Sequence, residues 1–140
     1  MNIIIINGPN LNLLGTREKE LYGETSFDDY FLYLKKKYSN LNLSYYQSNI
    51  EGELIDKIQE VGYTYDGIII NPGGYTHTSV AILDVIKSIT TPVIEVHLSN
   101  IYSREEFRRK SLISFAVQGG VFGLGLKSYE LALKFWAIKS

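Results

Sequence analysis

Two histidines are the side chains of this chain best suited to proton transfer near neutral pH. His77 and His97 are the only histidines among 140 residues, and each follows an apolar run that predicts a buried strand. Imidazole changes its charge near pH 6.5, so it gives or takes protons readily under physiological conditions. Glu95 shares a strand face with His97, because side chains alternate along a strand. A carboxylate there can fix the tautomer of the imidazole and keep it available as an acid.

The same side chains allow other interpretations. A single histidine at a strand end is compatible with a purely structural role. His77, Glu95 and His97 are also acceptable ligand types for a metal, although a structural zinc site needs a fourth ligand that is not visible here. The sequence favours acid–base chemistry without a metal.

These residues are positioned by an alternation of strands and helices. The apolar runs have both faces hydrophobic, which is typical of buried parallel strands, and Ser26 is expected to cap the first helix. The pattern predicts an α/β fold with a five-stranded parallel sheet between two layers of helices. Strands are expected at Ile3–Ile6, Leu41–Gln47, Gly67–Ile70, Val93–Val96 and Phe115–Val117, the last before the glycine-rich stretch Gly119–Gly125. Helices are expected at Ser26–Tyr38, Glu53–Val61, Ser79–Ile89 and Ser128–Ile138, with a brief one at Arg104–Lys110.

Polar segments follow four of the predicted strands. They are Asn7–Asn12, Gln47–Asn49, Asn71–Ser79 and His97–Asn100. In an open parallel sheet the binding crevice lies beyond the carboxyl ends of the strands, so these segments are expected to line one pocket. Asn-Gly-Pro is also common turn chemistry, and any one asparagine can simply serve the loop backbone.

Composition limits the class of protein. The chain is 45% hydrophobic and 21% charged, which predicts one globular domain over residues 1–140. A formal net charge of −1 gives no general attraction to nucleic acid or to an anionic membrane. The four isoleucines within Met1–Asn7 form too short a run for a signal peptide or a membrane span, and the chain has no cysteine. We expect a cytoplasmic protein.

Longer motifs resemble the type II 3-dehydroquinate dehydratases. The resemblance is in register from residue 2 to about residue 130, and it implies a flavodoxin-like three-layer α/β/α sandwich. Departures from the family pattern are Gly74, Tyr102-Ser103 and the divergent segment 111–127, none at an expected site residue. The motifs are Asn7–Gly15 with Arg17 and Tyr22-Gly23, then Gln47–Asn49, Glu51–Ile55, Ile70–Gly73, Tyr75–Ser79, Glu95–Ile101 and Arg104–Arg108.

The resemblance implies elimination of water from 3-dehydroquinate through an enolate, with no cofactor and no metal. It makes Tyr22 the base and Arg17 the cation that lowers the pKa of its phenol from about 10. Asn10 is the candidate for stabilising the enolate oxygen, through an ordered water. His97, supported by Glu95, is the proton donor to the leaving hydroxyl.

The same resemblance supplies substrate-binding residues. Arg108 is expected to bind the ring carboxylate, with backbone N–H groups of Leu98 and Ser99 as further donors. Asn71 and His77 resemble the pair that binds the ring hydroxyls. Arg104 and Arg109 are expected to be solvated or structural.

An oligomer is expected as well. The helix Ser79–Ile89 is apolar on nearly all sides, so a neighbour is expected to cover its outer face. In the family the matching residue of Asp84 reaches the active site of an adjacent subunit in a trimer, and trimers assemble into a dodecamer. An exposed helix residue is the alternative for Asp84.

Other classes fit less well. A flavin carrier needs hydroxyl residues after the first strand and a receiver needs acids at Asn7 and Asn71, while Gly123-x-Gly125 lacks the third glycine of a dinucleotide turn. No serine-hydrolase elbow is present. A catalytically inactive binding module of the same fold stays an alternative, as does the same reaction in quinate breakdown rather than in the shikimate pathway.

Overall fold

The computed structural model describes residues 1–16 and 19–138 and contains one fully parallel, five-stranded sheet in the order β2-β1-β3-β4-β5. This is the strand order of flavodoxin-like folds. The strands are β1 (Asn2–Asn7), β2 (Asn42–Gln47), β3 (Gly67–Asn71), β4 (Val93–His97) and β5 (Gly119–Phe122).

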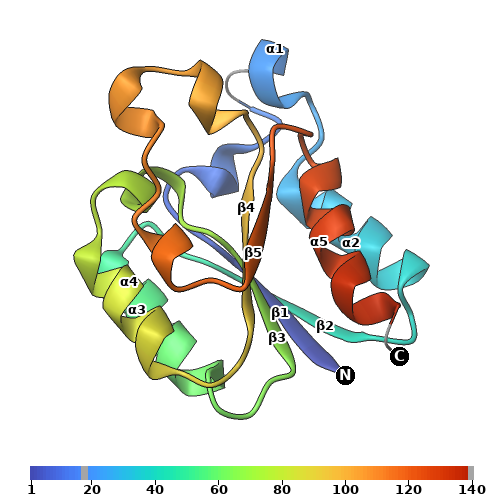
Figure 1. Cartoon of the computed structure of the whole chain (residues 1–140). Helices are drawn as coiled ribbons and strands as arrows, with labels where there is room; N and C mark the ends of the chain where they lie inside the picture. The colour runs from blue at the N-terminus through green and yellow to red at the C-terminus, as the bar shows by residue number, and fades with distance from the viewer. Residues whose placement is uncertain (17–18, 139–140) are drawn as a thin grey trace.

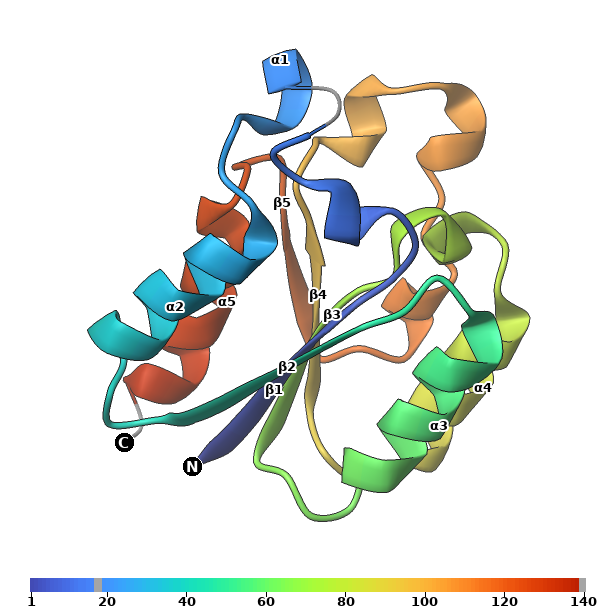
Figure 2. The same cartoon turned by 180° about the vertical axis from the view of Figure 1, so that it is seen from behind.

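Helices cover both faces of the sheet. The helices α3 and α4 lie together on one face, while α2 and α5 lie on the other (Figures 1 and 2). The predicted three-layer arrangement is therefore confirmed. The α-helices are α1 (Lys19–Tyr22), α2 (Phe27–Lys37), α3 (Glu51–Val61), α4 (Val80–Ser88) and α5 (Lys127–Ala137). Short 3-10 helices are η1 (Leu11–Leu13), η2 (Gly73–His77), η3 (Ile101–Ser103), η4 (Glu106–Arg108) and η5 (Ile113–Phe115).

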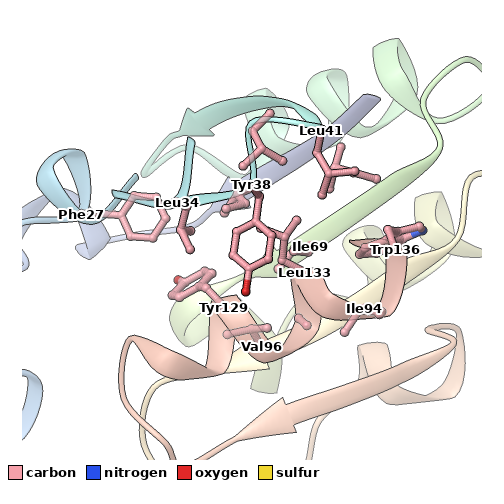
Figure 3. Close-up of a cluster of buried hydrophobic side chains, with 14 of the residues drawn as sticks. Phe27, Leu34, Tyr38, Leu41, Ile69, Ile94, Val96, Tyr129, Leu133 and Trp136 are labelled. Atoms are coloured by element: carbon pink, nitrogen blue, oxygen red, sulfur yellow. The ribbon is translucent and has the colours of Figure 1, made fainter. Parts of the chain in front are cut away.

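Two cores form because successive side chains of a strand point to opposite faces. In β1, Ile3 and Ile5 face α2 and α5, whereas Ile4 and Ile6 pack toward α3 and α4. Figure 3 shows the first of these cores, where Tyr129 of α5 packs among aliphatic side chains of the sheet and the ring of Phe27. The alternation continues to the carboxyl ends of the strands. It therefore also decides which of the two cores each polar residue at a strand end faces.

Two helices begin at serine caps. Ser26 accepts a hydrogen bond from the backbone N–H of Asp29, as the sequence predicted. Ser79 accepts one from the N–H of Ile82 at the start of α4. Each serine oxygen satisfies a backbone donor that has no partner inside the helix.

The predicted fifth strand at Phe115–Val117 is wrong. Residues Ile113–Phe115 form the 3-10 helix η5, and the strand is the glycine-containing segment Gly119–Phe122. Gly119 and Gly120 have low intrinsic strand propensity, but pairing with β4 supplies the ladder that local sequence does not indicate. The brief helix expected at Arg104–Lys110 is likewise reduced to the single turn η4.

The connections after the strands gather at one end of the molecule. There α1 and the orange segment that carries η3 and η4 both lie beyond the same end of the strands in the two views (Figures 1 and 2). Over the residues that the structure describes, no helix combines the length and the apolar character needed to cross a membrane.

Candidate active site

A cavity of about 220 Å³ opens at the carboxyl ends of β1, β3 and β4. Seven of the eleven predicted site residues line it: Asn10, Asn71, His77, His97, Leu98, Ser99 and Arg108. The remaining lining residues are Pro9, Leu11, Leu14, Gly73, Gly74, Ile101 and Arg104. The pocket thus brings together residues from chain segments that are up to about a hundred positions apart. This is expected at the carboxyl ends of parallel strands.

The loop after β1 is shaped by close backbone approach. A Cβ on Gly8 would lie 2.4 Å from the carbonyl oxygen of Pro72, so only glycine lets the loops after β1 and β3 meet there. Asn10 has a φ of 72°, in the left-handed region that asparagine tolerates better than most residues. Its backbone N–H donates to the Oδ1 atom of Asn49 over 3.0 Å. These contacts place Asn10 at the rim of the pocket.

His97 and Glu95 form a buried pair at the end of β4. The Nε2 atom of His97 is hydrogen-bonded to the Oε2 atom of Glu95, and the two residues are 7% and 4% exposed. The predicted contact between these side chains is therefore present. Because a carboxylate only accepts, Nε2 carries a proton and Nδ1 is the nitrogen left for other partners.

The carboxyl group of Glu95 has two more donors. The hydroxyl of Ser111 donates to Oε2 over 2.6 Å, and that of Ser114 donates to Oε1 over 2.7 Å. Burial by itself would raise the pKa of Glu95. The hydrogen bond and charge of His97, together with the hydrogen bonds from both serines, hold that pKa below its usual range. Glu95 is therefore an anion at neutral pH.

His77 is fixed in one neutral form. Its Nδ1 atom lies 2.8 Å from the carbonyl oxygen of Lys110, which cannot donate, so Nδ1 carries the proton. Burial lowers the pKa of His77, and the charges of His97, Arg108 and Arg104 lower it further. Its Nε2 atom is then an acceptor suited to a hydroxyl group.

Asn71 lies on the opposite face of the sheet from Glu95. Its Nδ2 atom donates to the hydroxyl of Tyr129 over 2.9 Å, and that hydroxyl donates to the Oδ1 atom of Asn7 over 2.8 Å. The Oδ1 atom of Asn71 accepts from the N–H of Gly73. An amide has further hydrogen-bonding capacity, so Asn71 can serve this network and also face a ligand.

Two arginines reach the pocket from the segment after β4. The Nε atom of Arg108 lies 2.8 Å from the Oε2 atom of Glu105. Arg104, which we expected to be solvated or structural, lines the pocket and donates from Nη1 to the hydroxyl of Ser99 over 3.4 Å. The contact with Ser99 fits a structural role, whereas the place of Arg104 on the pocket wall was not predicted.

Besides Glu95, which contacts His97, three predicted residues remain to be placed. Asp84 is exposed on α4. Arg17 lies outside the described residues, and so does the side chain of Tyr22, whose backbone ends α1. Their roles stay predictions.

His77, Glu95 and His97 are the side chains of metal-ligand type in this region. Across residues 1–16 and 19–138, no group of three or more histidine and acidic side chains is arranged to hold a metal ion.

Known proteins resemble this chain along nearly its whole length. It is 54% identical to a 3-dehydroquinate dehydratase of Caldicellulosiruptor saccharolyticus, over 94% of this chain and 92% of that protein. The crystal structure of a type II dehydroquinase from Butyrivibrio crossotus superposes with a TM-score of 0.89 at 46% identity, covering 96% of both chains. One from Propionibacterium acnes gives a TM-score of 0.91 at 39% identity, covering 98% of this chain and 96% of that one. The family described as dehydroquinase class II matches residues 1–137, and this chain belongs to that family.

Proposed function

We propose that this protein is a 3-dehydroquinate dehydratase that converts 3-dehydroquinate to 3-dehydroshikimate and water. The single observation that supports this most is the pocket itself, in which two histidines, an asparagine and an arginine line one cavity of a chain in this family. The reaction is a step of the shikimate pathway, and quinate breakdown uses the same chemistry.

The proposed reaction begins with removal of a proton from the carbon beside the ketone. Tyr22 acts as the base in its phenolate form, and Arg17 stabilises that phenolate, as their places in the family motif imply. The electron pair of the broken C–H bond becomes an enolate, whose oxygen Asn10 helps to stabilise, through water.

Loss of the hydroxyl completes the elimination. The enolate collapses, the C–O bond breaks, and the leaving oxygen takes a proton from His97 to depart as water. Glu95 supports this step because its negative charge stabilises the imidazolium before the transfer. Tyr22 ends with one proton more and His97 with one fewer, so solvent restores both before the next turnover.

Binding is assigned to the rest of the pocket. Arg108 receives the ring carboxylate, together with the backbone of Leu98 and Ser99, because a guanidinium pairs well with a carboxylate. His77 accepts a hydrogen bond from a ring hydroxyl at Nε2, and Asn71 binds a neighbouring hydroxyl. The fixed neutral form of His77 supports this assignment.

An oligomer is part of the proposal. Val80 is 57% exposed and Asp84 is exposed on the same helix, α4, which leaves an apolar surface with an acid in it. We propose that a neighbouring subunit covers this surface, that Asp84 reaches that subunit's site, and that trimers built this way form a dodecamer in the cytoplasm. Light scattering should then give a particle far larger than 15.9 kDa, and Asp84→Ala should weaken the assembly and turnover together.

The direct test is an ultraviolet assay of the purified protein with 3-dehydroquinate, without added metal or cofactor. A rising absorbance from the conjugated enone product is expected. Tyr22→Phe and Arg17→Ala should each lower kcat by about 10² or more. A folded protein that binds the substrate but forms no product would instead indicate an inactive binding module.

A further inference from the structure

The segment after η4 reaches back to both histidines of the pocket. Its first carbonyl, at Lys110, accepts from His77, and its serines at 111 and 114 donate to the two oxygens of Glu95. This short stretch therefore contacts the imidazole of His77 directly and that of His97 through Glu95. The sequence indicated nothing beyond a divergent segment there.

The segment is itself firmly anchored. Ile113 is fully buried in the core between the sheet and α4. The N–H of Leu112 donates to the carbonyl of Thr76 over 2.9 Å, and the carbonyl of Ile113 accepts from Ala116 over 2.9 Å. Because the backbone between the two serines is held at Leu112 and Ile113, the serine hydroxyls are preorganised toward Glu95.

We propose that Ser111 and Ser114 are positioning residues for proton donation by His97, acting through the carboxylate of Glu95. Two hydroxyl donors, one to each oxygen, fix the plane of the carboxylate, and this plane fixes the ring of His97. They also stabilise the charged form of a carboxyl group that is almost fully removed from water. The proposal rests on the roles of Glu95 and His97 given above.

The two serines are not equivalent. Ser111 is 8% exposed and donates to Oε2 of Glu95, the same oxygen that accepts from Nε2 of His97. Ser114 is exposed, and with Glu95 and His97 it lines a second cavity, of about 270 Å³, beside β5. Water can therefore replace the hydroxyl of Ser114 but not that of Ser111, so losing Ser111 should have the larger effect.

The experiment compares Ser111→Ala, Ser114→Ala and the double variant, each with and without Glu95→Gln, by kcat and KM across pH. Ser44→Ala is the matched control, because the buried hydroxyl of Ser44 has no hydrogen-bond partner among the described residues. Thermal unfolding of every variant separates loss of fold from loss of positioning. The other charged or titratable groups at the pocket, His77, Arg104 and Arg108, are unchanged throughout.

Ser111→Ala should lower kcat by about tenfold at constant KM, since a hydrogen bond to a charged group is removed. The acidic limb of its kcat profile should move to higher pH by about one unit, because the charged form of Glu95 loses a donor. Ser114→Ala should cost about two- to threefold. In the Glu95→Gln background, neither serine variant should change kcat further by more than about twofold.

A kcat profile of Ser111→Ala that superposes on that of the starting protein would overturn the proposal, as would serine effects that are fully additive with Glu95→Gln. A ¹³C NMR titration of the Glu95 carboxyl keeps the test independent of turnover. If the protein is inactive on 3-dehydroquinate, the proposed function fails, yet a raised pKa of Glu95 in Ser111→Ala would still support the serine contacts. An unchanged pKa there would refute them whatever the activity.

Discussion

Two polar networks lie at the carboxyl ends of the strands, on opposite faces of the sheet, and they differ in what surrounds them. On one face, Tyr129 links Asn7 and Asn71 inside the core of α2 and α5. On the other, Glu95 links His97 to two serines between two cavities. The first network contains neutral groups, whereas the second contains a buried anion. We expect the first network to hold the strand ends in place and the second to serve the proposed chemistry.

The neutral network has the character of a structural tie. Tyr129 is fully buried, and burial raises the pKa of its phenol far above the usual range, so its hydroxyl stays protonated and donates to Asn7. Its contacts join α5 to the ends of β1 and β3. Because the amide of Asn71 also lines the pocket, this tie fixes where that amide lies.

The charged network should give the largest effect when it is broken. We expect Glu95→Gln to lower kcat by about 10² or more, because a neutral amide stabilises the imidazolium of His97 far less than a carboxylate does. Steady-state turnover with thermal unfolding measures this. Glu60→Gln, which changes an exposed acid paired with Lys57, is the control and should leave kcat within about twofold. Equal turnover in the two variants would contradict a functional role for the Glu95 network.

The neutral network should respond in stability instead. Tyr129→Phe removes the hydroxyl that serves Asn7 and Asn71, and we expect the free energy of unfolding to fall by about 1–3 kcal/mol. Urea unfolding measures the loss. The effect of Tyr129→Phe on kcat should be smaller than that of Glu95→Gln. A large fall in kcat at unchanged stability would show that this network too belongs to the chemistry.

Arg108 tests whether binding and chemistry separate within the pocket. Arg108→Ala should raise KM by about tenfold with a smaller change in kcat, since it removes the carboxylate partner from substrate and transition state alike. Arg109→Ala is a neighbouring control, because Arg109 is exposed and does not line the cavity. If kcat fell while KM held, Arg108 would act in the transition state rather than as an anchor.

The sequence predicted four of the five strands well and misplaced the fifth. The isoleucine-rich strands β1 and β3 are apolar on both faces, so their type and direction followed from pattern alone, and period two placed Glu95 beside His97. The strand at Gly119–Phe122 was missed because its pairing with β4, not its own residues, decides its conformation. Ser111 and Ser114 were missed for a similar reason: isolated serines carry no periodic signal, and only the tertiary fold brings them to Glu95. The place of Arg104 on the pocket wall likewise depends on where the 3-10 turns after β4 end.

The acid sensitivity of the fold offers the smallest and sharpest distinction between the two networks. The pKa of Glu95 in the folded chain lies below its ordinary value of 4.5. Its anionic contacts therefore contribute stability at pH values above 4.5, and this contribution is lost as the pH falls through the lower, folded-state pKa. The neutral network has no such dependence, because the phenol of Tyr129 is protonated throughout the acid range. Melting temperatures measured from neutral to acidic pH should thus fall less steeply for Glu95→Gln than for the starting protein, whereas Tyr129→Phe should lower the whole curve without changing its slope. A Tyr129→Phe curve with altered acid slope would mean that the two faces of the sheet edge are electrostatically coupled.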